Sequence, residues 1–343
     1  MKCINFAETP ELFYADSEFE QAVARFIADW NSPSSTVAVK TSGSTGVPKL
    51  IEAEKNKMQH SAMMTCEFLN INKGDTALLC LPTEYISGKM MIVRSMVKGL
   101  KLYVSEPALS PLEAVSFPID FCAMTPLQVE HSLNNIYHIK NLIIGGAAVS
   151  ETLKKSIFTA FTSSGTGNSR IFETFGMSET LSHIALKQIY PQEEPFFTVL
   201  NGVDISRDER GCLKIFAPKL NPNVLQTNDL VEMVGKNQFR FLGRLDNVIN
   251  SGGAKIFPEE LEALAKKEIT KEIVFIGLAD EQLGQRLTAV VEGAFDEEIK
   301  QTINGLEYSR SFHRPKDIIF IDRIPRTPNG KISRLALKSL LQS

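Results

Sequence analysis

The sequence predicts an α/β protein with two parts, a large doubly wound α/β domain followed by a small α+β domain. Two observations predict this class. From residue 36 to about residue 175, short β-branched or apolar runs alternate with helix-like stretches, as buried parallel strands alternate with their connecting helices. After Pro191 this alternation gives way to closely spaced strand-like runs and one helical pattern. The length of 343 residues also exceeds the usual size of a single core.

The elements of the first part follow from their composition. Five short runs rich in β-branched and apolar residues predict strands: 36–40, 76–82, 100–105, 141–146 and 170–176. Three longer stretches with helical spacing of apolar residues predict helices: 55–69, 87–99 and 151–161. Glycine turns follow the runs at 141–146 and 170–176. In open α/β sheets, ligands bind outside the carboxyl ends of the strands, so these turns are expected at a site.

The second part begins with antiparallel strand patterns, GCLKIF and FRFLG. The segment 252–268 is then expected to open a helix, with Pro258 near the first helical position and Glu259 and Glu260 in the first turn, both of which suit a helix N-terminus. Three more runs predict strands: EIVFIGLAD, RLTAVVEG and DIIFIDRIP.

Composition excludes several classes of function. The 37 basic and 40 acidic residues give a net charge of −3, which predicts neither a nucleic-acid partner nor an anionic membrane surface. No apolar run approaches the ~18 residues that span a bilayer, and residues 1–21 lack a basic start followed by an apolar core, so no signal peptide is expected. Five scattered cysteines without a CxxC pair argue against disulfides or zinc. We expect a cytoplasmic protein.

A glycine-rich and hydroxyl-rich stretch, TSGSTGVPK at residues 41–49, follows the first predicted strand of the large part. Glycines let backbone N–H groups turn toward an anion, while hydroxyls and a lysine add donors and charge. The P-loop pattern GxxxxGK[ST] is not met, because Gly43 and Gly46 are three apart and Lys49 follows a proline. The stretch predicts a phosphate-binding loop of another type, with a polar surface turn as the alternative.

This stretch resembles the phosphate loop of the adenylate-forming superfamily, which contains acyl- and aryl-CoA ligases, peptide-synthetase adenylation domains and luciferases. Further segments resemble that family's motifs, in its order: IIGGAAVS (143–150), FETFGMSET (172–180), QTNDLVEM (226–233), GRLDNVINSGGAKIFPEELE (243–262) and IPRTPNGKISR (324–334). The resemblance covers residue 36 to the end. It implies the adenylate-forming fold, shortened at its N-terminus, with a large domain over 1–245 and a mobile C-terminal domain over 246–343.

The resemblance implies a binding site for ATP and Mg²⁺. The phosphates are expected on Thr41, Ser42, Gly43, Ser44, Thr45, Gly46, Lys49 and Ser178. Adenine and ribose are expected on Gly145, Gly146, Ala147, Phe175, Asp229 and Arg244. Glu179 is the expected Mg²⁺ ligand, since carboxylate oxygens suit this cation. A solvated surface carboxylate is the alternative for Glu179, and a structural turn is the alternative for the glycines at 145–146.

The implied reaction has two steps at one site. A carboxylate attacks the α-phosphate of ATP, pyrophosphate leaves, and a thiol then takes the acyl group. By the resemblance, Lys331 bridges the acid and the α-phosphate, Asp246 is the hinge between the domains, and Gly252 and Gly253 line the CoA tunnel. A bare turn is an equal alternative for the two glycines.

The acid itself is indicated by a segment at 81–107. It resembles the substrate-wall helix of o-succinylbenzoate–CoA ligases of menaquinone biosynthesis, with Tyr85 in the usual histidine place. Lys89 and Arg94 are candidates for the aromatic carboxylate of that acid, against the alternative of basic residues on a solvated helix face. Ser182 and His183 are expected in the wall of the acid pocket.

Three readings of function stay open. The first is an o-succinylbenzoate–CoA ligase, and the second is a ligase for another acid or a stand-alone adenylation protein that loads a carrier protein. The third is a non-catalytic nucleotide-binding relative, against which five chemistry-bearing residues are present together: Lys49, Glu179, Asp229, Arg244 and Lys331. Because family members usually have over a hundred residues ahead of the phosphate loop and this chain has 40, we expect either an exposed surface or a homodimer that covers it.

Overall fold

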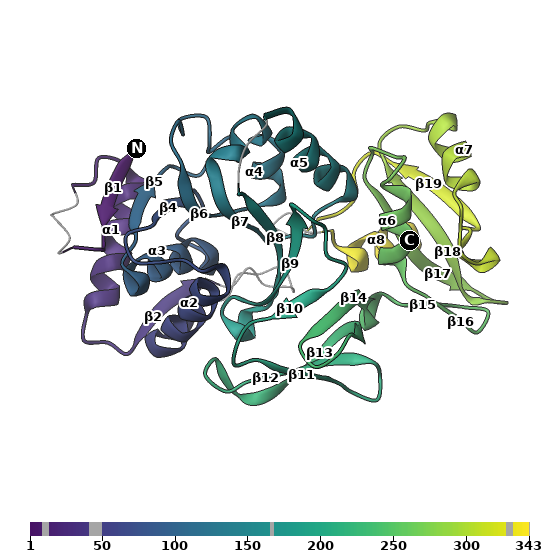
Figure 1. The fold of residues 1–343 in the computed structure, drawn as a ribbon. Coiled ribbons are helices and arrows are strands. Elements are labelled where there is room, and N and C mark those ends of the chain that lie inside the picture. Colours follow the sequence, from purple (N-terminus) through teal and green to yellow (C-terminus); the bar gives the residue numbers. More distant parts are fainter. Residues whose placement is uncertain (9–13, 41–49, 165–167, 327–331, 343) are drawn as a thin grey trace.

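The computed structural model describes residues 1–8, 14–40, 50–164, 168–326 and 332–342. Two sheets with their helices make up most of it, a large one in the first part of the chain and a small one in the last part (Figure 1). The chain passes from the large sheet to the small one at the short 3-10 helix η3 (Leu245–Asn247).

The large sheet contains twelve of the described strands, in the order β1-β5-β4-β6-β7-β8-β9-β10-β14-β13-β12-β11. Their bounds are β1 (Lys2–Asn5), β4 (Thr76–Leu79), β5 (Lys101–Val104), β6 (Ile119–Met124), β7 (Ile139–Ile144), β8 (Arg170–Gly176), β9 (His183–Tyr190), β10 (Phe197–Val199), β11 (Asp204–Arg207), β12 (Cys212–Ala217), β13 (Asn221–Met233) and β14 (Gln238–Arg244). From β5 to β8 neighbouring strands are parallel, and from β8 onward they are antiparallel. The parallel order 5-4-6-7-8 is that of a doubly wound sheet.

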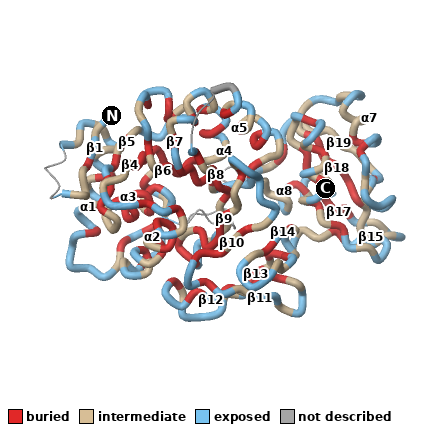
Figure 2. Tube along the Cα trace, in the orientation of Figure 1, coloured by how far each residue is buried: buried red, intermediate tan, exposed pale blue. Residues whose placement is uncertain are grey.

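Helices cover both faces of the parallel strands. They are α1 (Glu18–Asn31), α2 (Lys55–Leu69), α3 (Ile86–Lys98), α4 (Pro126–Glu130), η1 (Leu133–His138) and α5 (Glu151–Ser164). Successive residues of a strand face opposite sides, so Ala77 and Leu79 of β4 join the core with α1, α2 and α3, whereas Leu78 joins the core with α4 and α5. The buried residues therefore run through the sheet (Figure 2).

A separate two-stranded sheet is formed by β2 (Thr36–Lys40) and β3 (Leu50–Glu54), which pair antiparallel with Lys40 opposite Leu50. The predicted phosphate loop, 41–49, joins these two strand ends and lies outside the described residues.

The small sheet has the order β16-β15-β18-β17, with β19 parallel to β18. Its elements are β15 (Ile249–Ser251), β16 (Ala254–Ile256), α6 (Pro258–Ala265), β17 (Ile273–Asp280), β18 (Gly284–Glu292), α7 (Glu297–Gly305), η4 (Ser311–His313), β19 (Asp317–Ile321) and α8 (Arg334–Gln342). Arg334 donates to both oxygens of Glu262, at 2.7 and 2.8 Å, and to the carbonyl of Phe275. This partly buried ion pair holds α8 against α6 and β17.

Most expected elements are confirmed, and α2 has the predicted bounds, 55–69. The helix expected within the segment 252–268, with Pro258 near its first position, is confirmed at its start, because α6 begins at Pro258. Gly252 and Gly253, with φ of 56° and 82°, form the two-residue turn between β15 and β16, ahead of the helix. Positive φ at both positions is what a tight hairpin turn requires. Within the described part of the chain, no helix is both long enough and apolar enough to cross a membrane.

Candidate functional site

The candidate site lies at the carboxyl ends of β6, β7 and β8. Gly145 follows β7 and donates its backbone N–H to the carbonyl of Met124 at the end of β6, at 3.1 Å. A Cβ on Gly145 would come within 2.6 Å of the Thr174 hydroxyl on β8, so the close approach requires glycine. Gly146, with φ of 89°, and Ala147 are exposed beside it. The strand ends thus bring the predicted adenine turn next to the predicted Mg²⁺ segment.

The turn from β8 to β9 is tightly constrained. A Cβ on Gly176 would lie 2.4 Å from the Cα of His183 and 2.5 Å from the carbonyl of Ser182, both of them backbone atoms. Leu181 has φ of 64° and ψ of −37°, and the N–H of Ser182 bonds to the carbonyl of Thr180 at 2.7 Å, which is a γ-turn. Such strained backbone concentrates at functional sites.

The side chains of Glu179 and Ser182, before and after this γ-turn, lie in different environments. Glu179, in the 3-10 helix η2 (Ser178–Thr180), is exposed, whereas Ser182 accepts a 2.8 Å hydrogen bond from Nη2 of Arg94 on α3. The expected metal ligand and the expected acid-pocket residue therefore sit on one turn, four residues in length.

Arg94 is the most unusual charged group of the site. Its side chain is only 2% exposed, and among the described residues no carboxylate lies within ion-pair distance. Its Nε has no hydrogen-bond partner in the described part of the chain, and Nη1 faces only the thioether of Met91, at 3.9 Å. Burial lowers the pKa of this guanidinium to about 10. The solvated helix face considered for Arg94 is thereby excluded.

His183 lies beside Arg94 and is likewise buried. Its Nδ1 is 3.3 Å from the hydroxyl of Ser182, and its Nε2 is 3.0 Å from the hydroxyl of Thr65 on α2. Burial, and to a lesser extent the positive charge of Arg94, holds the pKa of the imidazole well below its usual range. The structure thus assembles Arg94, Ser182 and His183 into one cluster.

The other two acid-pocket candidates lie elsewhere. Lys89 points to β2 and α1, where Nζ donates to the carbonyl of Ala38 at 2.5 Å and lies 5.4 Å from the ring centroid of Phe26. Tyr85 caps the start of α3 and forms an isolated bridge with Lys40 at the end of β2. Lys89 and Arg94 are five residues apart, so on a helix they face different sides.

The expected ribose residues lie together on paired strands. Asp229 on β13 is opposite Arg244 on β14, and their side chains form an ion pair at 3.4 Å. Burial raises the pKa of Asp229, and Arg244 opposes this. Arg244 also pairs with Asp246 at 2.8 Å, and Asn228 donates to Asp246 at 3.0 Å. Asp246, the predicted hinge residue, is thus bonded to side chains of both β13 and β14 in the large sheet.

Phe175 is half-buried in a group of aromatic rings. Its ring centroid is 5.0 Å from that of Phe239 and 5.6 Å from that of Phe197. The adenine contact expected for Phe175 stays a prediction.

Lys331 also lies outside the described residues, but the ends of its segment are fixed. Arg326 and Ile332 form an isolated antiparallel bridge, and the N–H of Ser333 donates to the carbonyl of Pro325 at 2.8 Å. Gly252 and Gly253 lie exposed at the hairpin tip, where the N–H of Gly252 donates to the carbonyl of Leu283.

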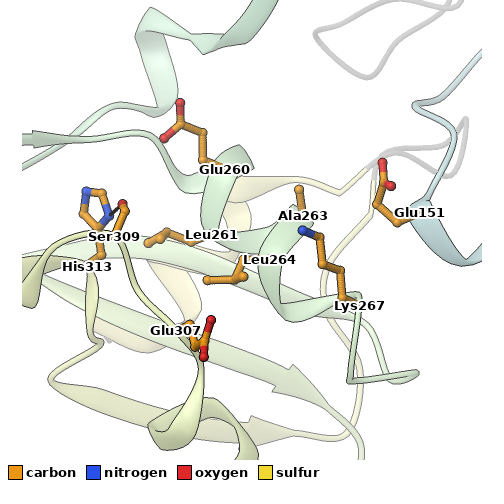
Figure 3. Close-up of a pocket in the computed structure, with 9 residues that line it drawn as sticks. All are labelled: Glu151, Glu260, Leu261, Ala263, Leu264, Lys267, Glu307, Ser309 and His313. Carbon is orange, nitrogen blue, oxygen red and sulfur yellow. Dashed lines mark hydrogen bonds between the residues drawn. The ribbon is translucent and has the colours of Figure 1, made fainter. Parts of the chain in front are cut away.

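A cavity of about 440 Å³ lies apart from these residues, between α6, the segment before β19 and the first residue of α5 (Figure 3). Glu260 and Glu307 line it together with Glu151, and Lys267 is the one lysine among its lining residues. None of the residues predicted for the site lines this cavity. A hydrogen bond from the hydroxyl of Thr152 to the carbonyl of Lys266, at 3.2 Å, joins the two parts of the chain nearby.

Two family matches agree with this architecture. The AMP-binding enzyme family matches residues 6–201, and the C-terminal domain of AMP-binding enzymes matches residues 260–331. The first match alone spans more than half of the chain. The chain belongs to the AMP-binding enzyme family.

Three named proteins are similar to this AMP-binding enzyme over most of its length. A 2-succinylbenzoate–CoA ligase of Listeria monocytogenes is 25% identical over 98% of this chain and 75% of its own length. The crystal structure of an acyl-CoA synthetase (AMP-forming)/AMP-acid ligase II-like protein from Dyadobacter fermentans is 32% identical, covers 95% of both chains and has a TM-score of 0.64. The o-succinylbenzoate coenzyme A synthetase of Bacillus subtilis, solved with ATP and a magnesium ion, shares the fold, with a TM-score of 0.73 at 20% identity over 89% of this chain and 69% of its own.

The residues present fit Mg²⁺ bound together with a nucleotide. Within the described residues there is no cluster of three or more His, Cys, Asp or Glu side chains that could hold a metal ion. Glu179 is exposed at the strand ends, and no hydrogen bond or ion pair of its carboxylate to another described residue is found. Mg²⁺ is commonly held by one or two carboxylates together with substrate phosphates and waters, so a single free carboxylate at a nucleotide site is a suitable donor.

Two residues that contribute to the site, Thr65 and Glu173, were not predicted from the sequence. Thr65 is an ordinary member of a helical pattern, and nothing in the sequence places it beside His183. Glu173 is buried, accepts the N–H of Val149 at 3.1 Å and pairs with Lys187 at 2.7 Å, so it fixes the turn after β7 onto β8. A carboxylate inside an apolar strand, RIFETFG, is the signal that could have identified Glu173.

Proposed function

We propose that this AMP-binding enzyme is an ATP-dependent acid–CoA ligase that forms an acyl-adenylate and then a CoA thioester. The acid is 2-succinylbenzoate, which places the reaction in menaquinone biosynthesis. The names of its relatives support this activity. The reaction consumes ATP and CoA, both of which are cytoplasmic substrates, and this supports a cytoplasmic location.

The observation that carries the choice of acid is the buried Arg94. A desolvated cation without a counter-ion is costly, and buried groups without partners call for an explanation. A ligand carboxylate supplies the missing charge and the missing acceptor for Nε. An acid with two carboxylates, one for activation and one for Arg94, fits this need, whereas a fatty acid does not.

The remaining residues position ATP. Asp229 is an acceptor-only carboxylate and suits the two ribose hydroxyls, and Arg244 on the paired strand holds it in place. Glu179 holds Mg²⁺, which neutralises phosphate charge when it is bound. The γ-turn at Leu181 fixes the backbone of Glu179 relative to Ser182 and Arg94, so it limits the spacing between the metal and the far carboxylate of the acid.

The phosphate loop and Lys331 complete the proposal. We assign the β- and γ-phosphates to residues 41–49 and the charge that develops at the α-phosphate to Lys331. The segment 246–343 is proposed to rotate about Asp246 between the two half-reactions, after which Gly252 and Gly253 line the path of the thiol.

Steady-state kinetics of Arg94→Met test the choice of acid. We expect the KM for 2-succinylbenzoate to rise by about tenfold or more, as for loss of a charged hydrogen bond. The KM for ATP should stay within about threefold, because none of the described residues assigned to ATP contacts Arg94. Lys89→Met is the matched control, since it removes a cation from the same helix that points to Ala38. Equal effects of Arg94→Met on both KM values would remove Arg94 from the acid pocket.

A further inference from the structure

A chain of hydrogen bonds links Arg94 to a backbone carbonyl of α2. At each end of this chain the chemistry fixes which group is the donor and which is the acceptor. Nη2 of Arg94 contacts the Ser182 hydroxyl at 2.8 Å, and that hydroxyl is 3.3 Å from Nδ1 of His183. Nε2 of His183 is 3.0 Å from the Thr65 hydroxyl, which is 3.1 Å from the carbonyl of Ser61. A guanidinium can only donate and a carbonyl can only accept.

These two ends fix every proton between them. The Thr65 hydroxyl donates to the Ser61 carbonyl, so its oxygen accepts from Nε2 of His183. A neutral imidazole with a proton on Nε2 has a bare Nδ1, which accepts the hydroxyl proton of Ser182. The oxygen of Ser182 is then left to accept from Arg94. Each hydroxyl is used both as donor and as acceptor, and the ring is held in one tautomer.

We infer that Thr65 and His183 are positioning residues for recognition of the acid: through Ser182 they hold Arg94 so that its remaining N–H groups meet the far carboxylate of the substrate. This inference rests on the proposed function. All of the hydroxyl and imidazole groups behind Arg94 are neutral, so they orient the guanidinium without neutralising it. The depressed pKa of the buried His183 agrees with this neutral form.

The position of the chain favours a role in binding over one in stability. Thr65 belongs to α2, Arg94 to α3, and Ser182 and His183 to the turn that carries Glu179. Three separate elements therefore contribute side chains to one hydrogen-bond chain that ends on the guanidinium. Nε of Arg94 has no partner among the described residues, and Nη1 faces a thioether, a weak acceptor. A purely structural arginine would be expected to use these groups as well.

Thr65→Val tests the inference, because it keeps the volume and removes the hydroxyl. Thr65→Ser restores the hydroxyl, and Thr288→Val is the matched control, since Thr288 is fully buried in the small sheet and its hydroxyl has no partner in the described structure. Each protein is assayed with 2-succinylbenzoate and with 4-oxo-4-phenylbutanoate, the same acid without its aromatic carboxylate. The readout is the ratio of kcat/KM between the two acids.

We expect Thr65→Val to lower this ratio by about fivefold to tenfold, as for one charged hydrogen bond weakened, while Thr65→Ser and Thr288→Val keep it within twofold. Equal losses on both acids would show a structural role and overturn the inference. The wild-type enzyme tests the proposed function separately. If it does not prefer the acid with two carboxylates, the proposed function is wrong, whatever the Thr65 variants show.

A spectroscopic measurement covers the case in which Thr65→Val does not fold. Wild-type protein with ¹⁵N-labelled histidine, with the His183 signal assigned by its loss in His183→Asn, should show the Nε2–H tautomer near pH 7. An Nδ1–H tautomer or an imidazolium at His183 would reverse the hydrogen-bond chain and overturn the inference.

Discussion

Arg94 combines two properties that rarely occur together, full burial and the absence of a counter-ion among the described residues. Burying an ionised group costs several kcal/mol unless it is paired, and proteins normally pair it. The surrounding groups, Ser182, Met91 and the ring of Phe121 at 6.0 Å, supply one hydrogen bond and weak contacts only. On this account the free enzyme carries a destabilising charge that the substrate compensates.

Removal of this buried charge is expected to raise stability while it lowers activity. Arg94→Met replaces the cation with an apolar side chain of similar reach, so the free energy of unfolding should rise by about 1 kcal/mol or more. Urea denaturation of the enzyme without substrate measures it. A loss of stability would mean that Arg94 is compensated by the protein itself, and the need for a ligand carboxylate would disappear.

At the scale of elements, the turn between β8 and β9 decides the geometry of the site. Gly176 leaves no room for a Cβ against the backbone of Ser182 and His183, and Leu181 adopts the γ-turn that directs Glu179 outward. The two strands continue as an antiparallel pair on either side of it. A change in this turn is therefore expected to alter the proposed metal ligand and the proposed acid pocket together.

Gly176→Ala tests this role of the turn. The added Cβ meets backbone atoms that cannot move independently, so we expect a loss of about 2–3 kcal/mol in the free energy of unfolding. Gly305→Ala is the control: Gly305 ends α7 and a Cβ there meets nothing within 4 Å, so its effect should be below about 0.5 kcal/mol. Thermal denaturation of both variants compares them, and similar stability of the two would contradict the tight packing of the turn.

The sequence predicted these elements unevenly, for physical reasons. Periodicity located α2, because its buried apolar residues repeat with the period of a helix, and a short run rich in apolar and β-branched residues located β8. It did not show the hairpin of β15 and β16 ahead of α6, because these strands have three residues each and the two glycines of the turn carry no side-chain pattern. For the site, motif resemblance found Arg94, Ser182 and His183, which the fold brings together, but it also proposed Lys89, which the helix turns away. Thr65 was missed because its role depends on packing between α2 and β9, which no local pattern encodes.

At the scale of the whole molecule, the residues proposed for one reaction come from both the large and the small sheet. The parallel strands bring the predicted adenine turn and the Glu179 turn to one edge, and the β13–β14 pair presents Asp229 and Arg244 before the chain enters the small sheet at η3. Arg334 and Glu262 anchor α8, and with it the end of the segment that contains Lys331, to the small sheet. The expected homodimer stays a prediction of the sequence.

The most direct measurement is CoA-thioester formation with ATP and Mg²⁺, with 2-succinylbenzoate offered beside benzoate, succinate and a medium-chain fatty acid. We expect selective turnover of 2-succinylbenzoate, since only that acid places a second, aromatic carboxylate at Arg94. Turnover of the fatty acid or of benzoate at an equal or higher rate would contradict the assignment of the acid.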